Sequence, residues 1–290
     1  PEDKPLKDAL EKIFSGLENA DQLGSLLQIA EPVEKELRAI KEQEDKKQLA
    51  YLGNKQRTFF DTQPHSKDPG MRKFDIAPQT VLPVGVEDWD SWRARTGERL
   101  RFHFAQEAEA ADLGQQFFSA QASRGWRLFE LLGRRYDVVA ANPPYMGSKN
   151  MGPVLRKYVE QHYSSGKRDL YAAFILRCIE LCAEKGRVAM VTQQSWMFLR
   201  SYAAMRADGE AKPPTGLLYT TTLDSLVHLG RYAFSEIGNA VVAPVLFVTQ
   251  RRQPLAEHKL WACRLTAPRP SEQQAELLRM SIRSPESSTI

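Results

Sequence analysis

The chain has 290 residues, of which 42% are hydrophobic, and a formal net charge of +4, so it can bury a substantial core in one large domain or two smaller ones. No apolar run reaches the ~18 residues of a membrane-spanning helix, and no signal peptide opens the chain, which predicts a cytoplasmic protein without a membrane partner. Three cysteines and five scattered histidines exclude a disulfide framework and offer no metal-ligand spacing.

The first part of the chain is predicted to be helical over residues 4–60. Apolar residues recur there with a period close to 3.6, and Pro32 begins a second helix that runs from Val33 to about Gln56. This second helix is dense in charge and has few apolar positions. We therefore expect it to be a solvated helix or an edge helix.

Residues 61–98 are predicted to be a loop, because prolines and glycines punctuate them. Trp89 and Trp92 lie in this stretch, and we expect them to pin the loop to the body of the protein rather than to bind a ligand. Helical patterning returns over residues 107–132 and ends at Gly133.

Short apolar runs then predict an α/β fold. Residues 136–141 and 187–192 read as strands, and the apolar stretch 169–183 between them reads as a buried helix, so the three form a βαβ unit with parallel strands. Residues 223–229 and 241–249 are predicted to be an antiparallel pair at the edge of the sheet. A surface loop is expected at residues 207–222, and one more short strand at 260–265.

The sequence Asn142-Pro143-Pro144-Tyr145 follows the first strand directly. Proline cannot donate to a sheet ladder, so the strand must end there. The Asn142 amide oxygen and a proline carbonyl can accept both hydrogens of an exocyclic amino group, which makes its nitrogen more nucleophilic, and Tyr145 offers a flat face for a base that has left the duplex. The structural alternative is a turn that merely ends a strand.

Basic residues are concentrated around this motif. Between residues 124 and 168 there are nine lysines and arginines against three acidic residues. Such an excess can attract phosphates, although a solvated basic face is an equally good interpretation of charge alone.

Four segments resemble the γ-class adenine-N6 DNA methyltransferases, and most of all the PglX-type methyltransferases of BREX phage-defence systems, which are related to type IIG restriction-modification enzymes. The segments are Tyr136–Gly147, Lys167–Phe174, Lys185–Thr192 and His228–Gly230. The resemblance implies a Rossmann-like methyltransferase fold, S-adenosylmethionine as the methyl donor, and double-stranded DNA as a partner. Other proteins of a phage-defence system are further candidate partners.

The resemblance also implies roles for single residues. Asn142 and Pro143 would accept from the adenine amino group, and Tyr145 would stack on the ring. Phe234 falls where the family has a second aromatic residue against the base, although it could equally be a phenylalanine at the edge of the core. Asp169 is a weak candidate on the cofactor side and could simply cap the following helix.

One feature of the family is missing. No Asp-Pro-x-x-Gly-x-Gly loop for the cofactor occurs in the sequence, so no cofactor-binding residue can be assigned. We therefore expect an internal fragment that is inactive alone. Its expected domains are a helical insertion at 1–60, an irregular linker at 61–106, the second half of the catalytic domain at 107–250, and a linker at 251–290 toward a target-recognition region.

Two other functions remain open from the sequence. Protein-glutamine and RNA methyltransferases also use Asn-Pro-Pro-aromatic motifs, but they are usually compact. A module that binds DNA or a defence partner without turnover is the other alternative, because the cofactor loop is missing.

Overall fold

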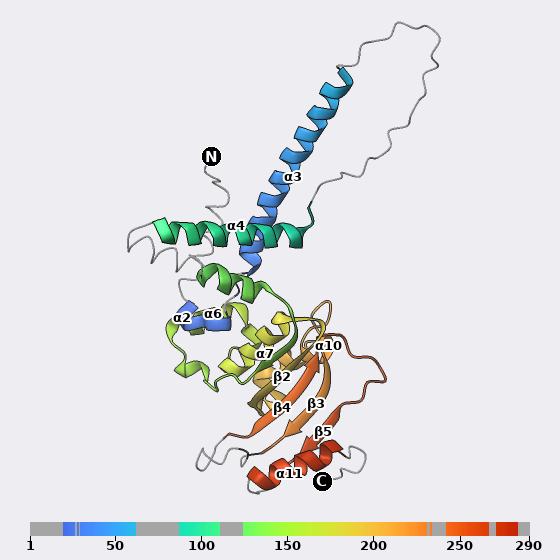
Figure 1. Ribbon diagram of the computed structural model, residues 1–290. Coiled ribbons are helices and arrows are strands. Elements are labelled where there is room, and N and C mark those ends of the chain that lie inside the picture. Colours follow the sequence, from blue (N-terminus) through green and yellow to red (C-terminus); the bar gives the residue numbers. More distant parts are fainter. Residues whose placement is uncertain are drawn as a thin grey trace, which may run out of the picture. The chain divides into compact units, whose positions relative to one another are not determined.

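The computed structural model describes residues 20–26, 28, 30–61, 87–110, 124–230, 233, 242–266 and 271–283 (Figure 1). The chain divides into two compact units. One contains Gln28–Leu132, and the other contains Asn19–Leu27 together with Gly133–Ile290. Within the described residues, no helix combines the length and the apolar character that crossing a membrane requires.

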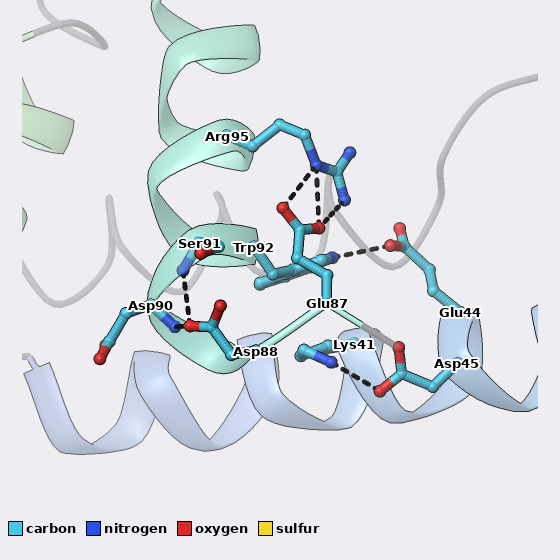
Figure 2. Close-up of polar contacts among 9 residues, drawn as sticks. All are labelled: Lys41, Glu44, Asp45, Glu87, Asp88, Asp90, Ser91, Trp92 and Arg95. Atoms are coloured by element: carbon cyan, nitrogen blue, oxygen red, sulfur yellow. Dashed lines mark hydrogen bonds and ion pairs between the residues drawn. The ribbon is translucent and has the colours of Figure 1, made fainter. Parts of the chain in front are cut away.

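The first unit contains α3 (Ala30–Asp61), α4 (Trp89–Ala110) and a helix at residues 124–133. Side chains of α4 bind those of α3: the Trp92 indole donates to Glu44 at 2.8 Å, as Figure 2 shows. Trp92 is buried, and its ring stacks on that of Trp89 with centroids 5.6 Å apart. Both tryptophans therefore serve packing, as expected, but they do so from a helix.

The predicted loop at 61–98 is wrong over its last ten residues, because α4 begins at Trp89. Asp88 explains the start of this helix. Its carboxylate accepts from the backbone amides of Asp90 and Ser91, both at 3.0 Å (Figure 2), and so satisfies two of the amides that a helix leaves free at its first turn. The hydrogen bonds from Ser91 lower the pKa of Asp88.

The second unit is built on one mixed sheet with the strand order β1-β2-β4-β3-β5. The strands are β1 (Tyr136–Ala141), β2 (Cys182–Gln193), β3 (Thr222–His228), β4 (Pro244–Gln250) and β5 (Trp261–Arg264). β1 is parallel to β2, β4 is antiparallel to both of its neighbours, and β5 is parallel to β3. Four strands thus run in one direction, and β4 alone is reversed.

The sheet confirms the α/β class, the first strand and the antiparallel pairing of β3 with β4. Two details differ from expectation. The pair does not form the edge, since β5 lies outside β3. The short strand predicted at 260–265 is present as β5, but residues 251–290, predicted to be a linker, also contain α11 (Ser271–Arg283), which lies beside β5 in Figure 1. Leu277 and Leu278 of α11 pack against buried residues of β3 and β5.

Helix α7 (Leu170–Leu181) covers β1 and β2 and supplies much of the core. Its Tyr171, Ala172 and Ile175 are fully buried with Val188 of β2. The helix is apolar nearly all round, which suits a helix enclosed on several sides. The predicted buried helix is therefore confirmed, although it ends at Leu181 and β2 begins immediately after it.

Short helices complete this unit. They are α2 (Ala20–Leu23), η1 (Gly24–Leu26), η2 (Ser148–Asn150), α6 (Pro153–His162), η3 (Ser164–Gly166), α8 (Ser195–Phe198), η4 (Arg200–Tyr202), α9 (Ala203–Arg206) and α10 (Leu217–Thr220). The predicted surface loop at 207–222 is thus partly helical, since α10 lies within it. Asp208 and Thr215 also pair as an isolated antiparallel bridge there.

Candidate active site

The Asn-Pro-Pro-Tyr motif leaves β1 at the carboxyl end of the sheet, where ligands of open α/β sheets bind. Asn142 and Pro144 are exposed, Pro143 is buried and Tyr145 is half-buried. The buried proline anchors the loop, and the exposed asparagine keeps its amide oxygen accessible. The side chain of Asn142 is therefore open to solvent, and its role as an acceptor remains a prediction.

Tyr145 is held by aromatic contacts. Its ring meets that of Tyr171 edge to face, with centroids 5.9 Å apart and planes at 82°. Tyr171 in turn lies 6.2 Å from the ring of Tyr202, so three tyrosines form a continuous chain. Edge-to-face pairs of this kind are favourable and fix the orientation of both rings.

The hydroxyl oxygen of Tyr145 is buried and has no hydrogen-bond partner among the described residues. Burial raises the pKa of Tyr145, because the phenolate would lose its hydration. The ring is therefore neutral at physiological pH. A neutral ring can lie against a nucleobase without bringing a charge into the site.

Asp169 joins the motif loop to helix α7. Its carboxylate accepts from the amide of Met146 at 3.0 Å and from the amide of Tyr171 at 3.4 Å. The Leu170 amide donates to the Met146 carbonyl at 2.9 Å, and Gly147 pairs with Asp169 as an antiparallel bridge. The residue after Tyr145 is thus fixed to the first turn of α7.

The expectation that Asp169 caps the helix is confirmed. Burial raises the pKa of Asp169, and its hydrogen bonds to backbone amides oppose that shift. A direct role for Asp169 toward a cofactor remains a prediction. The predicted Phe234 lies outside the described residues.

His228 was not singled out from the sequence, although it ends β3 at the same end of the sheet as Asn142. Its Nε2 atom is buried and has no hydrogen-bond partner among the described residues. Burial, together with the nearby Arg264 guanidinium, lowers the pKa of His228. The only signal in the sequence was its place in the His228–Gly230 segment, directly after an apolar run.

Among the described residues, the cavity beside Asn142 does not fit a cofactor site. A cavity of about 830 Å³ touches Asn142, but its other walls are mainly apolar side chains of β1, β2, β4 and α11. No carboxylate lines it within the part of the chain that the structure describes, so a ribose would find no acidic acceptor. Among the same residues, no group of histidine, cysteine or acidic side chains could hold a metal ion.

Comparisons with known proteins match the chain to one family and to two curated relatives. The model of the Eco57I restriction-modification methylase family matches residues 85–230, which are 146 of the 290 residues. Adenine-specific methyltransferase PglX of Lacticaseibacillus casei (strain Zhang) is 36% identical over 162 residues, which are 54% of this chain and 13% of that protein. Adenine-specific methyltransferase BrxX of Escherichia coli O9:H4 (strain HS) is 40% identical over 118 residues, or 41% of this chain and 9% of that protein.

One solved structure of a type I restriction-modification (R-M) system aligns with this chain at a TM-score of 0.40 and 14% sequence identity. The alignment covers 65% of this chain and 44% of the chain in that structure. The matched region of the chain spans only a small part of either curated relative, 13% and 9% of their lengths.

Proposed function

Because the chain belongs to the Eco57I restriction-modification methylase family, we propose that it carries the target-base site of a DNA methyltransferase specific for adenine. The proposed reaction moves a methyl group from S-adenosylmethionine to the N6 atom of a flipped adenine. The observation that carries the proposal is the exposed Asn142 on a rigid Pro-Pro loop at the carboxyl end of β1.

In this proposal the chain's own residues prepare the amino group. The Asn142 amide oxygen and the Pro143 carbonyl accept its two hydrogens, which turns the nitrogen lone pair away from the ring and toward the methyl donor. Pro144 keeps the loop extended, and Tyr145 stacks on the base that has left the duplex. Two neutral acceptors suit this task, because the amino group needs no strong base before it attacks.

The substrate is proposed to be double-stranded DNA. The names of both curated relatives describe adenine-specific methyltransferases, which supports adenine as the target. A role in phage defence, with other proteins of a defence system as partners, follows from the same resemblance. The residues that bind S-adenosylmethionine are not assigned in this chain, so no step of the reaction is attributed to them.

The test is methyl transfer from labelled S-adenosylmethionine to unmethylated bacterial DNA, with the protein that carries this chain and with its partner proteins added. We expect N6-methyladenine with the unsubstituted protein. Asn142→Ala should lower the rate by a factor on the order of 10²–10³, as loss of one hydrogen-bonding group at a reacting centre does.

Asn150→Ala is the matched control, because Asn150 is also exposed and lies eight residues further along the same loop region. It should keep the rate of the unsubstituted protein. Label in RNA or protein in place of DNA would contradict the proposal, and so would equal rates for Asn142→Ala and the unsubstituted protein.

A further inference from the structure

The structure separates the nine basic residues of the sequence cluster into groups with different surroundings. Arg124 and Arg127 lie in the first unit, whereas Arg134 and Arg135 precede β1 and thus lie at the end of the sheet away from Asn142. Arg156 bonds to backbone: its guanidinium donates to the carbonyls of Ser148, Lys149 and Met151. Arg134 and Arg135 therefore lie away from the motif, and the guanidinium of Arg156 is engaged by backbone carbonyls.

Three members of the cluster are brought beside the motif loop. Backbone pairing does this: the Ser148 amide donates to the Arg168 carbonyl at 2.9 Å, next to the bridge between Gly147 and Asp169. Lys149 follows Ser148 directly, and Lys167 precedes Arg168. These three side chains are exposed on two paired segments, one of which follows Tyr145 directly.

A fourth basic residue, Arg200, joins them from a distant part of the sequence. It begins η4, which lies against η3 immediately before Lys167. Tyr202, at the end of η4, contacts the ring of Tyr171. Burial raises the pKa of Tyr202, and the positive charge of Arg168 opposes this shift. Three segments thus converge around the tyrosine chain that holds Tyr145.

The charge of these four residues is not neutralised inside the protein. None of the four side chains makes an ion pair or a hydrogen bond with a described residue, and none is among the residues with further contacts. The carboxylate nearest in sequence, Asp169, is turned onto the amides of Met146 and Tyr171. Four exposed positive charges without partners inside the protein leave a local excess of positive charge, which attracts a polyanion.

We propose that Lys149, Lys167, Arg168 and Arg200 form a basic rim that binds the phosphate backbone of DNA next to the flipped base. The inference rests on the proposed function for the identity of the polyanion. Contacts of this type position a duplex without reading its sequence. The rim would hold the strand so that the target adenine lies over Asn142.

The test is the salt dependence of binding, measured by fluorescence anisotropy with a labelled DNA duplex and the 290-residue chain. The logarithm of the association constant falls with the logarithm of salt concentration by roughly 0.9 for each phosphate contact. Replacing all four rim residues with glutamine should therefore reduce this slope by about 3–4. A variant with Lys149→Arg, Lys167→Arg, Arg168→Lys and Arg200→Lys should keep the slope.

A matched control removes four exposed basic residues at the opposite end of the sheet, with Arg134→Gln, Lys185→Gln, Arg252→Gln and Lys259→Gln. This control changes the net charge by the same amount as the rim variant does, and it should retain most of the slope of the salt dependence. Circular dichroism of each variant checks that it is folded. The inference is overturned if both neutralised variants lose the same slope, if neither does, or if the unsubstituted chain binds no duplex.

RNA of the same length provides the remaining comparison. If the chain binds RNA through the rim and does not bind DNA, RNA replaces DNA as the proposed partner. Rim-dependent DNA binding by a protein that transfers no methyl group would overturn the proposed function and leave the rim in place. Methyl transfer to DNA, together with an unchanged salt-dependence slope in the rim variant, would overturn the rim and leave the proposed function in place.

Discussion

Asp169 has two structural roles at once, because one carboxylate caps α7 and holds the residue that follows Tyr145. A capping carboxylate is usually exposed and stabilised by the amides to which it binds. Here burial outweighs the hydrogen bonds and raises the pKa of Asp169 above its ordinary value of 3.8. The loop is therefore positioned at the cost of partly desolvating a charge.

This balance predicts how stability depends on pH. Since the pKa of Asp169 is raised in the folded protein, the folded state binds its proton more tightly than the unfolded chain does. The contribution of this residue to the free energy of unfolding is fully present below 3.8 and is lost as pH rises through the raised pKa. Asp169→Asn lacks this titration, and urea unfolding across the acidic range should show a flatter profile for that variant.

Asp169→Ala provides the comparison, because it removes the acceptor altogether and should cost about 1 kcal/mol of unfolding free energy. Methyl transfer should fall in Asp169→Ala and partly recover in Asp169→Asn, whose amide oxygen still accepts from Met146. Equal profiles for Asp169→Asn and the unsubstituted chain would argue against a buried, titrating carboxylate.

Residues whose role depends on near neighbours in the sequence were predictable. The end of β1 directly before Asn142 and the cap at Asp169 are of this kind. Arg200 and His228 are not, because only folding brings their segments, which are distant in sequence, to the end of the sheet where Asn142 lies. No local pattern marks a residue whose partners lie fifty or more positions away.

At the scale of elements, the close approach of η3 to α7 depends on Gly166. A Cβ atom at this position would lie 2.9 Å from the backbone carbonyl carbon and oxygen of Ala172 and 2.9 Å from the amide nitrogen of Ala173. These are backbone atoms of a buried helix and cannot easily move aside. Gly166→Ala should therefore lower the free energy of unfolding by roughly 1–3 kcal/mol.

Gly152→Ala is the control for this prediction. It precedes α6 with an ordinary φ of −60° or so, and a Cβ there would meet nothing within 4 Å. Its unfolding free energy should stay within about 0.5 kcal/mol of the original in denaturant titrations. A similar loss for both variants would contradict the steric explanation.

The elements were predicted best where the hydrophobic period and the residues that end an element indicate the same boundaries. β1 was predicted with its observed limits because prolines end it, and α7 because its apolar run follows a cap. The start of α4 was missed, although Asp88 is a typical capping residue directly before it. The nearby Pro83 and Gly85 favour a loop, and this signal masks the cap in the sequence.

At the scale of the whole molecule, a short early segment belongs to the unit with the sheet. Asn19–Leu27 groups with Gly133–Ile290. The Leu26 carbonyl accepts from the Tyr163 hydroxyl at 3.1 Å, and the Ser25 carbonyl accepts from Arg177 at 2.9 Å. The domain limits predicted from sequence did not separate this segment, because its partners are more than a hundred residues away.

Leu26→Ala should therefore destabilise the unit that carries the site. Leu26 is buried with Val159 and Tyr163, and truncating such a leucine costs about 2–5 kcal/mol. Hydrogen exchange followed by mass spectrometry should show faster exchange in peptides of α7. Leu37→Ala is the matched variant, since Leu37 is equally buried but lies in the other unit. Faster exchange of α7 in Leu37→Ala alone would contradict the grouping.

The reversed direction of β4 has a consequence for where the chain can change in length. His228 pairs with Val245, so the chain leaves β3 and enters β4 at one end of the sheet, the end where Asn142 lies. Insertions and deletions between His228 and Pro244 leave the register of both strands intact. The length of the chain at the end where Asn142 lies can thus vary without altering the sheet that supports this end.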